Sequence, residues 1–291
     1  MEYKLIKIED EDYPTSLKSI KDPPQELYVM GNVKILNKTC FSIIGSRKCT
    51  DIGIKRAQKI AKQLCEYNLC IVSGMALGID TAAHTGTILA GGETIAVLGT
   101  GLNNIYPKQN INLAKEIVNT GGAIITEYEP NEKVNPRNFP QRNRIISGLS
   151  IGTLVVEAHY RSGTTITARL AKNQGRKVFA IPNTIDNKYG VITNELIKDG
   201  AILTRNVKDI VSEYDFLKKQ KKKIVKEFIT NIDTVPEKYR KIYNVLSTEK
   251  INIEEIAKKL CEPISCINST LTMMELEGFV KKFPGEFYER K

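Results

Sequence analysis

Seven short apolar runs recur between residues 41 and 204, most of them with glycine or serine at an end. Their hydrophobic positions are mostly continuous rather than alternating, which is typical of strands buried on both faces of a parallel sheet. The predicted strands are Phe41–Gly45, Leu69–Gly74, Thr94–Gly99, Ala123–Glu127, Ile151–Ala158, Val178–Pro182 and Ala201–Thr204.

Segments between these strands repeat apolar residues at the three- and four-residue spacing of a helix. The predicted helices are Ile54–Glu66, Asn110–Asn119, Thr165–Gln174 and Thr193–Asp199. Gly121, Gly122 and Gly200 stand where helix C-caps belong. The alternation predicts an α/β fold with an extended, doubly wound, mainly parallel Rossmann-like sheet, which places ligands at the C-terminal ends of its strands.

The last part of the chain has a different pattern. Helical periodicity in Tyr239–Leu246, Ile253–Leu260 and Ile264–Leu276 is followed by a hairpin, Gly278–Tyr288, with Pro-Gly at its turn. This arrangement predicts a small winged-helix domain. We therefore expect four parts: a short N-terminal segment (1–38), a Rossmann-like domain (39–216), a Lys-rich linker (217–235) and a winged-helix domain (236–291).

The composition excludes several classes of protein. No apolar run approaches the roughly 18 residues of a membrane span, and the first ten residues are too charged for a secretory signal. We therefore expect a cytoplasmic protein that does not contact a membrane. The six cysteines form no Cys-x-x-Cys pair and there are only two histidines, so no metal site is expected.

The positive charge is unevenly distributed. The formal net charge is +10, but residues 133–177 carry nine Lys/Arg against one Glu, and residues 45–62 carry six against one Asp. Residues 236–291 carry ten basic residues against nine acidic ones. Because the excess gathers around glycine-rich turns, it favours a polyanion site in the first domain over a generally solvated basic surface.

The most informative polar stretch is Phe139–Ser150, which we expect to be a loop. It places Arg142, Asn143 and Arg144 just before a predicted strand, beside the flat face of Phe139. A second polar turn, Arg161–Thr167, follows that strand and opens a helix. Arginine forks and free N–H groups at a helix start bind phosphates, and an aromatic face stacks a base.

Two further turns match this chemistry. Gly45, Ser46 and Arg47 follow the first predicted strand, and Ser73 and Gly74 end the second. The Gly-x-Gly-x-x-Gly motif of dinucleotide-binding sites and the P-loop motif are both absent, so no cofactor is expected. Asp80 and His84 lie four residues apart, which allows a catalytic pair, but no activated nucleophile accompanies them and a structural hydrogen bond is favoured.

These motifs, taken in order, resemble the DprA/Smf family, DNA-processing protein A of bacterial natural transformation. The similarity extends from about Leu17 to the C-terminus. The matching segments are Ile43–Arg47, Ser73–Asp80 with His84, Thr94–Gly101 with Tyr106-Pro107, Phe139–Ser150, Val155–Ala158, Ser162–Ala168 and Arg176–Pro182.

The resemblance implies a protein of competence and DNA recombination that binds single-stranded DNA, protects incoming strands and loads the recombinase RecA. It also implies a homodimer formed through the Rossmann-like domain, and no catalysis. The DNA-binding residues that it implies are Gly45, Ser46, Arg47, Ser73, Gly74, Arg142, Asn143, Arg144, Ser162 and Gly163. Phe139 is added as a base-stacking candidate, and phosphates are assigned to Arg47, Arg142 and Arg144.

Two departures from the family pattern concern one loop. Pro182-Asn183 stands where relatives commonly have Pro-Gly, and Thr184–Val191 is unlike the usual serine-lysine-glycine turn.

Two other hypotheses on the function stay open. One is a nucleotide-binding sensor or nucleotide hydrolase of a related Rossmann-like family. The other is an adaptor whose winged-helix domain contacts a protein rather than DNA.

Overall fold

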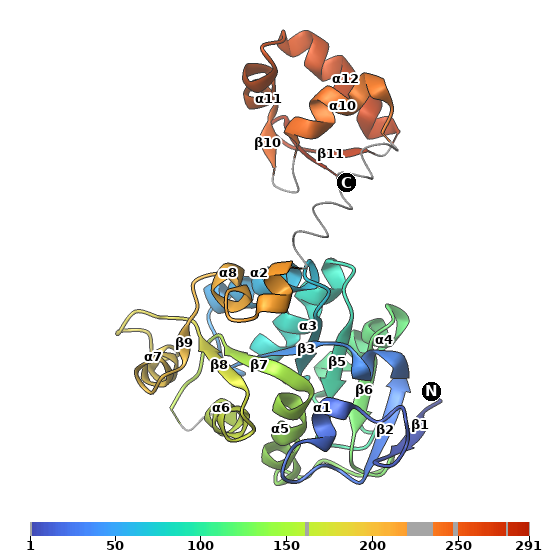
Figure 1. Ribbon diagram of the computed structural model, residues 1–291, viewed down its shortest axis with the longest axis vertical. Coiled ribbons are helices and arrows are strands. Elements are labelled where there is room, and N and C mark those ends of the chain that lie inside the picture. The colour runs from blue at the N-terminus through green and yellow to red at the C-terminus, as the bar shows by residue number, and fades with distance from the viewer. Residues whose placement is uncertain (1, 161–162, 220–234, 247–249, 278, 291) are drawn as a thin grey trace. The chain divides into compact units, whose positions relative to one another are not determined.

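The computed structural model of the protein describes residues 2–160, 163–219, 235–246, 250–277 and 279–290. The chain divides into two compact units, Met1–Lys218 and Lys219–Lys291, which we treat separately (Figure 1). Residues 220–234, which include most of the predicted Lys-rich linker, lie outside the described residues.

In the described part of the first unit, nine strands form one sheet. They are β1 (Lys4–Lys7), β2 (Glu26–Gly31), β3 (Cys40–Ile44), β4 (Cys70–Ser73), β5 (Thr94–Val97), β6 (Ala123–Thr126), β7 (Ser150–Val155), β8 (Lys177–Ala180) and β9 (Ile202–Leu203). Their order in the sheet is β1-β2-β6-β5-β4-β3-β7-β8-β9. All neighbours from β6 to β9 run parallel. The prediction of a mainly parallel Rossmann-like sheet is confirmed, and its seven strands correspond to β3 to β9.

Strands β1 and β2 were not predicted. They form an antiparallel pair in which Ile6 lies opposite Leu27, and β2 also pairs antiparallel with β6. Both Ile6 and Leu27 are fully buried. Part of the segment 1–38, expected to stand apart from the sheet, thus completes one edge of it.

Helices cover both faces of the sheet (Figure 1). The helices on one face are α1 (Thr15–Lys18), α5 (Asn138–Leu149), α6 (Gly163–Asn173) and α7 (Val191–Lys198). Those on the other face are α2 (Asp51–Cys65), α3 (Ile79–Leu89), α4 (Ile111–Asn119) and α8 (Val207–Val211). The short 3-10 helices η1 (Val33–Asn37) and η2 (Lys108–Asn110) lie in the connections. Alternate strand residues supply the two cores: Ile44 and Val72 face the first layer, while Ile43 and Ile71 face the second.

The stretch expected to be a loop, Phe139–Ser150, is a helix over most of its length. Helix α5 begins at Asn138 and ends at Leu149, so only Ser150 belongs to the following strand. Pro140 falls in the first turn, where its missing N–H has no helical partner to lose. The prediction of a loop was wrong because Arg142 and Asn143 are buried beside Ile145 and Ile146, and these polar residues interrupt the apolar periodicity.

The order in which strands are added to the sheet reverses between the neighbouring strands β3 and β7. Strands β4, β5 and β6 follow one another on the β3 side, whereas β8 and β9 follow on the β7 side. Loops after β3 and after β7 therefore diverge from neighbouring strands, which leaves a crevice at their C-terminal ends. The fold alone thus marks one position for a ligand.

The second unit has its own core. Helices α10 (Glu237–Val245), α11 (Ile253–Leu260) and α12 (Ile264–Leu276) pack with a three-stranded sheet. Its strands are β10 (Ile251–Asn252), β11 (Val280–Phe283) and β12 (Phe287–Arg290), in the order β10-β12-β11. The prediction of a winged-helix domain is confirmed.

Candidate nucleic-acid interface

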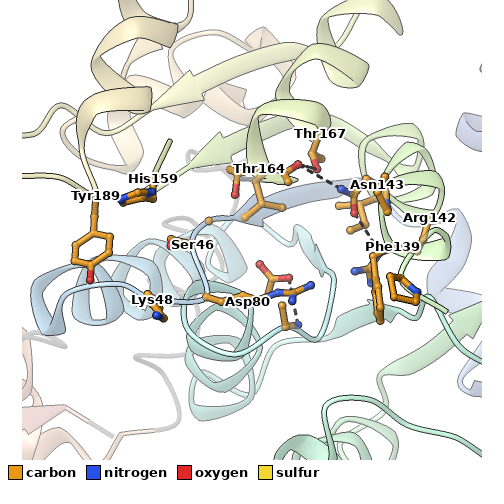
Figure 2. A pocket seen from close by; sticks show the side chains of 18 of the residues that line it. Ser46, Lys48, Asp80, Phe139, Arg142, Asn143, His159, Thr164, Thr167 and Tyr189 are labelled. Atoms are coloured by element: carbon orange, nitrogen blue, oxygen red, sulfur yellow. Dashed lines mark hydrogen bonds between the residues drawn. The ribbon is translucent and has the colours of Figure 1, made fainter. Parts of the chain in front are cut away.

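A cleft of about 800 Å³ opens at the switch point of the sheet (Figure 2). Its lining comes from the loops after β3 and β7, from α5 and α6, and from the segment before α7. Seven of the eleven residues implicated by the sequence line it: Gly45, Ser46, Arg47, Phe139, Arg142, Asn143 and Gly163. Gly74 lines an adjoining pocket of about 90 Å³ that shares Arg47, Phe139 and Arg142 with the cleft. Ser162 lies outside the described residues.

The loop after β3 is held rigidly at its base. Ser46 N donates to Glu157 O at 2.7 Å, and Ile79 N donates to Ser46 O at 3.3 Å. A Cβ on Gly45 would stand 2.9 Å from Glu157 O and closer still to the Ile79 side chain, so only glycine fits between them.

The end of this loop is fixed by Glu157, which is 1% exposed. Its carboxylate accepts from Thr50 N at 2.8 Å and from Thr50 Oγ1 at 2.6 Å. The Thr50 Oγ1 atom in turn accepts from Gly53 N at 3.0 Å and caps α2. Residues 47 and 48 therefore project from a loop that is anchored on both sides.

Arg47 and Lys48, on the loop after β3, are exposed cations of the cleft. The Arg47 guanidinium lies 5.6 Å from the centre of the Phe139 ring, and Tyr106 packs against the same ring at 5.7 Å. In the described parts of the chain, neither cation forms an ion pair. A cation that keeps its full charge beside a half-buried aromatic ring suits a phosphate and its attached base.

Arg142 has a different environment, because its side chain is buried at 4% exposure. Its Nη1 atom donates to Gly74 O at 2.7 Å and also to Val97 O. The Asp80 carboxylate beside it accepts from Gly74 N at 3.2 Å and Ala76 N at 3.3 Å. Burial lowers the pKa of Arg142 to about 10 against the opposing effect of Asp80, and burial raises the pKa of Asp80 despite Arg142.

Arg142 lines the cleft and also holds the turn after β4 to β5 through two backbone carbonyls. The N–H groups of Ser46 and Gly74 donate to Glu157 O and Asp80. A Cβ on Gly74 would meet both Arg142 Nη2 and Asp80 Oδ2 at 2.8 Å, which explains the glycine.

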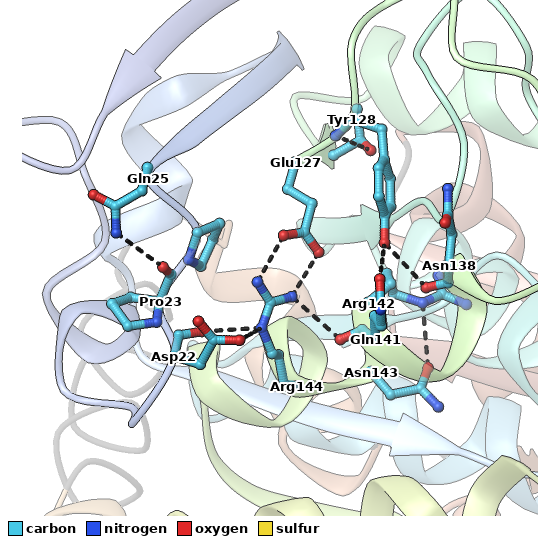
Figure 3. Close-up of polar contacts among 12 residues, drawn as sticks. Asp22, Pro23, Gln25, Glu127, Tyr128, Asn138, Gln141, Arg142, Asn143 and Arg144 are labelled. Carbon is cyan, nitrogen blue, oxygen red and sulfur yellow. Dashed lines mark hydrogen bonds and ion pairs between the residues drawn. The ribbon is translucent and has the colours of Figure 1, made fainter.

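Arg144 and Ser73 do not line the cleft. Arg144 forms a two-pronged ion pair with Glu127 at 2.5 and 2.6 Å, and its Nε donates to Asp22 O at 2.9 Å (Figure 3). Burial lowers the pKa of Arg144, but the hydrogen bonds and charge of Glu127, together with Asp22 and Tyr128, raise it above its usual value. Ser73 is fully buried and its Oγ donates to Ile43 O at 2.6 Å. Arg144 thus ties α5 to β6 and the N-terminal segment, and Ser73 ties β4 to β3.

Asp80 and His84 do not form a catalytic pair. His84 is fully buried, and its Nδ1 lies 2.7 Å from Thr94 Oγ1. Thr94 Oγ1 already donates to Ile71 O at 2.6 Å, so His84 Nδ1 is the donor of that pair. The hydrogen bond links α3 to β5, which is the structural role that the sequence favoured.

Among the residues of the cleft that were missed are His159, Tyr160, Lys188 and Tyr189. They come from the stretch after β7 and from the loop before α7. The only sequence signal for the last two was that Thr184–Val191 departs from the usual turn. Asn143 links α5 to the start of α6 within the cleft, since its Nδ2 donates to Gly163 O at 3.5 Å.

Searches for other kinds of site gave two negative results. In the described residues, no group of His, Cys, Asp or Glu side chains is arranged to hold a metal ion. None of the described helices is long and apolar enough to cross a bilayer.

Comparison with known proteins yields a consistent set of similarities. The family model of DNA recombination-mediator protein A matches residues 4–215, and the model of the DprA winged helix domain matches residues 230–286. DNA processing protein DprA of Streptococcus pneumoniae is 42% identical over 71% of this chain and 73% of that protein. Protein Smf of Escherichia coli is 34% identical over 98% of this chain and 77% of that protein.

Solved structures show the same similarity. The X-ray structure of DprA from Streptococcus pneumoniae superimposes with a TM-score of 0.70 at 41% identity, covering 74% of this chain and 75% of that one. The DprA structure from Helicobacter pylori, described for its single-stranded DNA binding mode, has a TM-score of 0.66 at 31% identity. That match covers 73% of this chain and 95% of the other.

Proposed function

The chain belongs to the DprA family of DNA recombination-mediator proteins, and on this premise we propose that it binds single-stranded DNA in the cleft at the switch point. The observation that carries the proposal is the unpaired Arg47 guanidinium beside the exposed part of the Phe139 ring. Together they match the phosphate and base of one nucleotide. The relative from Helicobacter pylori, described for binding single-stranded DNA, supports the same ligand class.

Single strands are expected to bind better than duplexes. The aromatic ring of Phe139 can stack only on a base whose own partner has been removed, and the cleft presents this ring beside its cations. A duplex offers phosphates to Arg47 and Lys48 but keeps its bases stacked inside. Discrimination therefore depends on the ring, and electrostatic affinity depends on the cations.

The first test is fluorescence anisotropy with labelled oligothymidine and a duplex across a salt series. We expect tighter binding to the single strand, with a logarithmic salt slope of about −0.7 for each phosphate contact. Arg47→Glu should weaken binding roughly tenfold or more at low salt, because it replaces attraction by repulsion. Its melting temperature should stay within a few degrees, since the side chain is exposed.

The matched control is Lys115→Glu, an exposed charge reversal on α4 outside the cleft. It changes net charge as much as Arg47→Glu does, so a general loss of positive charge would weaken both variants equally. Near-native affinity of Arg47→Glu, or equal binding of single strand and duplex, would contradict the proposal that the cleft binds single-stranded DNA.

No catalytic step is proposed. The carboxylate on the cleft floor, Asp80, already accepts from Gly74 N and Ala76 N beside Arg142. Glu157 is occupied by Thr50. These occupied acids argue against the alternative of a nucleotide hydrolase. Incubation with nucleoside monophosphates tests it, and release of free base would contradict the proposal.

We further propose that the bound strand is protected and delivered to RecA, and that the protein acts as a homodimer. Support comes from membership in a family of recombination mediators. The test is RecA filament assembly on single-stranded DNA with and without the protein, together with light scattering for the mass in solution. Faster assembly and a mass of two chains are expected, whereas a monomer that leaves the assembly rate unchanged would exclude both roles.

A further inference from the structure

The cleft has a second aromatic wall, which no residue implicated by the sequence provides. His159, Lys188 and Tyr189 line the cleft together with Arg47 and Phe139. Figure 2 shows His159 and Tyr189 close together at one end of the cleft, with Phe139 and Arg142 at the other and Ser46 between them. The two walls therefore face the same space from different parts of the fold.

The two walls have the same composition. On the first wall, Tyr106 lies 5.7 Å from the Phe139 ring and the Arg47 guanidinium lies 5.6 Å from it. On the second wall, the ring of His159 lies 6.0 Å from that of Tyr189. The Lys188 ammonium lies 5.2 Å from the centre of the Tyr189 ring. Each wall thus combines an aromatic ring, a second ring tilted against it and a cation.

Hydrogen bonds fix the main chain of the second wall. Ala158 N donates to Tyr189 O at 2.7 Å, which ties the segment before α7 to the stretch after β7. Tyr189 N donates to Asn187 Oδ1 at 3.0 Å, and Asn187 Nδ2 donates to Asn183 Oδ1 at 3.3 Å. The position of Tyr189 is therefore set by the loop itself.

Glycine is required at the next position of this loop. A Cβ on Gly190 would stand only 2.1 Å from the Cβ of Asn183. Gly190 therefore packs against Asn183 and completes the loop that carries Lys188 and Tyr189.

We propose that Tyr189, His159 and Lys188 form a second nucleotide subsite, which stacks one base and binds one phosphate beside the nucleotide held at Phe139. This inference rests on the proposed binding of single-stranded DNA. The side chains of Lys188 and His159 are exposed and Tyr189 is half-buried, so all three are open to a ligand. Base stacking tolerates any sequence, and this subsite therefore adds affinity without base selectivity.

The experiment uses the full chain and an oligothymidine in which 2-aminopurine replaces one base at successive positions. Stacking on an aromatic ring quenches this fluorophore. We expect two quenched positions in the wild-type complex. Phe139→Leu should relieve one of them and Tyr189→Leu the other. Tyr189→Leu should also weaken binding by roughly fivefold or more, the equivalent of one lost stacking contact.

Three further variants keep the test decisive. Tyr189→Phe retains the ring and is expected to recover most of the affinity that Tyr189→Leu loses. Tyr3→Leu removes a half-exposed ring that packs against Tyr28 outside the cleft, and it controls for general loss of aromatic surface. If Tyr189→Leu fails to fold, His159→Leu and Lys188→Gln replace it, because both side chains are exposed.

The outcomes separate the subsite from the function on which it rests. No binding by the wild type contradicts the proposed function itself. The second subsite alone is overturned if binding weakens in Phe139→Leu but not in Tyr189→Leu, and if Tyr189→Leu still quenches the same two positions as the wild type. The same result for His159→Leu and Lys188→Gln has the same meaning where Tyr189→Leu does not fold. Loss of affinity in Tyr189→Leu with relief of one position and recovery in Tyr189→Phe supports it.

Discussion

At the scale of single residues, three arginines that look equivalent in the sequence have three different environments. Arg47 is exposed at the cleft, Arg142 is buried against two backbone carbonyls, and Arg144 is paired with Glu127. A guanidinium that already has its hydrogen bonds inside the protein is a poor ligand for a phosphate, because binding would break those bonds. Of the three, Arg47 therefore has the guanidinium best suited to the proposed phosphate contact.

Replacing Arg142 should affect stability more than electrostatic binding. Arg142→Met leaves Asp80 buried without its countercharge, which costs about 3 kcal/mol and lowers the melting temperature by roughly 6–12 °C. Binding by the remaining folded protein should keep the wild-type salt slope. The measurements are thermal unfolding and anisotropy across a salt series. A reduced slope at an unchanged melting temperature would instead make Arg142 a phosphate ligand.

His84 should make the stability depend on pH. Burial, and secondarily Arg142, lowers the pKa of His84 to about 3, whereas an unfolded histidine titrates near 6.5. Between these two values the unfolded chain binds a proton that the folded chain does not, so stability falls as the pH falls. Below about pH 6 the contribution approaches 1.4 kcal/mol per pH unit.

The pH effect is measured by denaturant unfolding between pH 7 and 5, with His84→Asn as the matched variant. Asparagine can still donate to Thr94 Oγ1 but does not titrate. The difference in unfolding free energy between the two proteins should change with pH by the amount given above. Parallel pH profiles would show that His84 is not the group responsible.

At the scale of elements, helices α2 and α3 are packed so closely at Gly86 that there is no space for a side chain between their backbones. A Cβ on Gly86 of α3 would stand 2.6 Å from both Cα and O of Gln58 in α2. These are backbone atoms and cannot rotate away. Because α2 begins at the loop that carries Arg47 and Lys48, the contact between the helices also supports the cleft.

Gly86→Ala should destabilise the protein although alanine favours a helix. The helical preference contributes about 1 kcal/mol in favour of alanine, but overpacking against backbone costs roughly 1–3 kcal/mol, so the loss should dominate. Gly148→Ala on α5 is the comparison, since its Cβ meets only the ends of the Leu17 and Ile20 side chains, which can move. Denaturant unfolding should show the larger loss for Gly86→Ala, and the reverse order would refute the argument.

At the scale of the whole molecule, the cleft belongs entirely to the first compact unit, while the winged-helix unit has a separate core. Helix α12, the recognition helix of a winged-helix fold, contains no lysine or arginine. This helix therefore gains nothing from counterion release on phosphates.

Removal of the second unit should leave the binding of single-stranded DNA intact. A fragment of residues 1–218 is expected to bind oligothymidine within about twofold of the full chain, since it retains every residue of the cleft. Anisotropy of both proteins at the same salt concentration measures this. A loss of tenfold or more would assign DNA contacts to residues 219–291.

Local order along the chain was determined by the sequence itself. Continuous apolar runs predicted β3 to β9, and helical spacing predicted α2, α4, α6 and α7, because burial on both faces and burial on one face leave different periodicities. The winged-helix unit followed for the same reason. The motifs also identified the family and seven of the residues that line the cleft.

Only the tertiary structure decided which side chains were available to a ligand. Helix α5 was hidden because its buried face carries Arg142 and Asn143, whose partners lie far away in the sequence. Strands β1 and β2 become strands by pairing with each other, and β2 also pairs with β6. Whether a guanidinium is free or bonded, and whether Tyr189 faces Phe139 across one cleft, depends on contacts between distant segments, and a local pattern does not encode them.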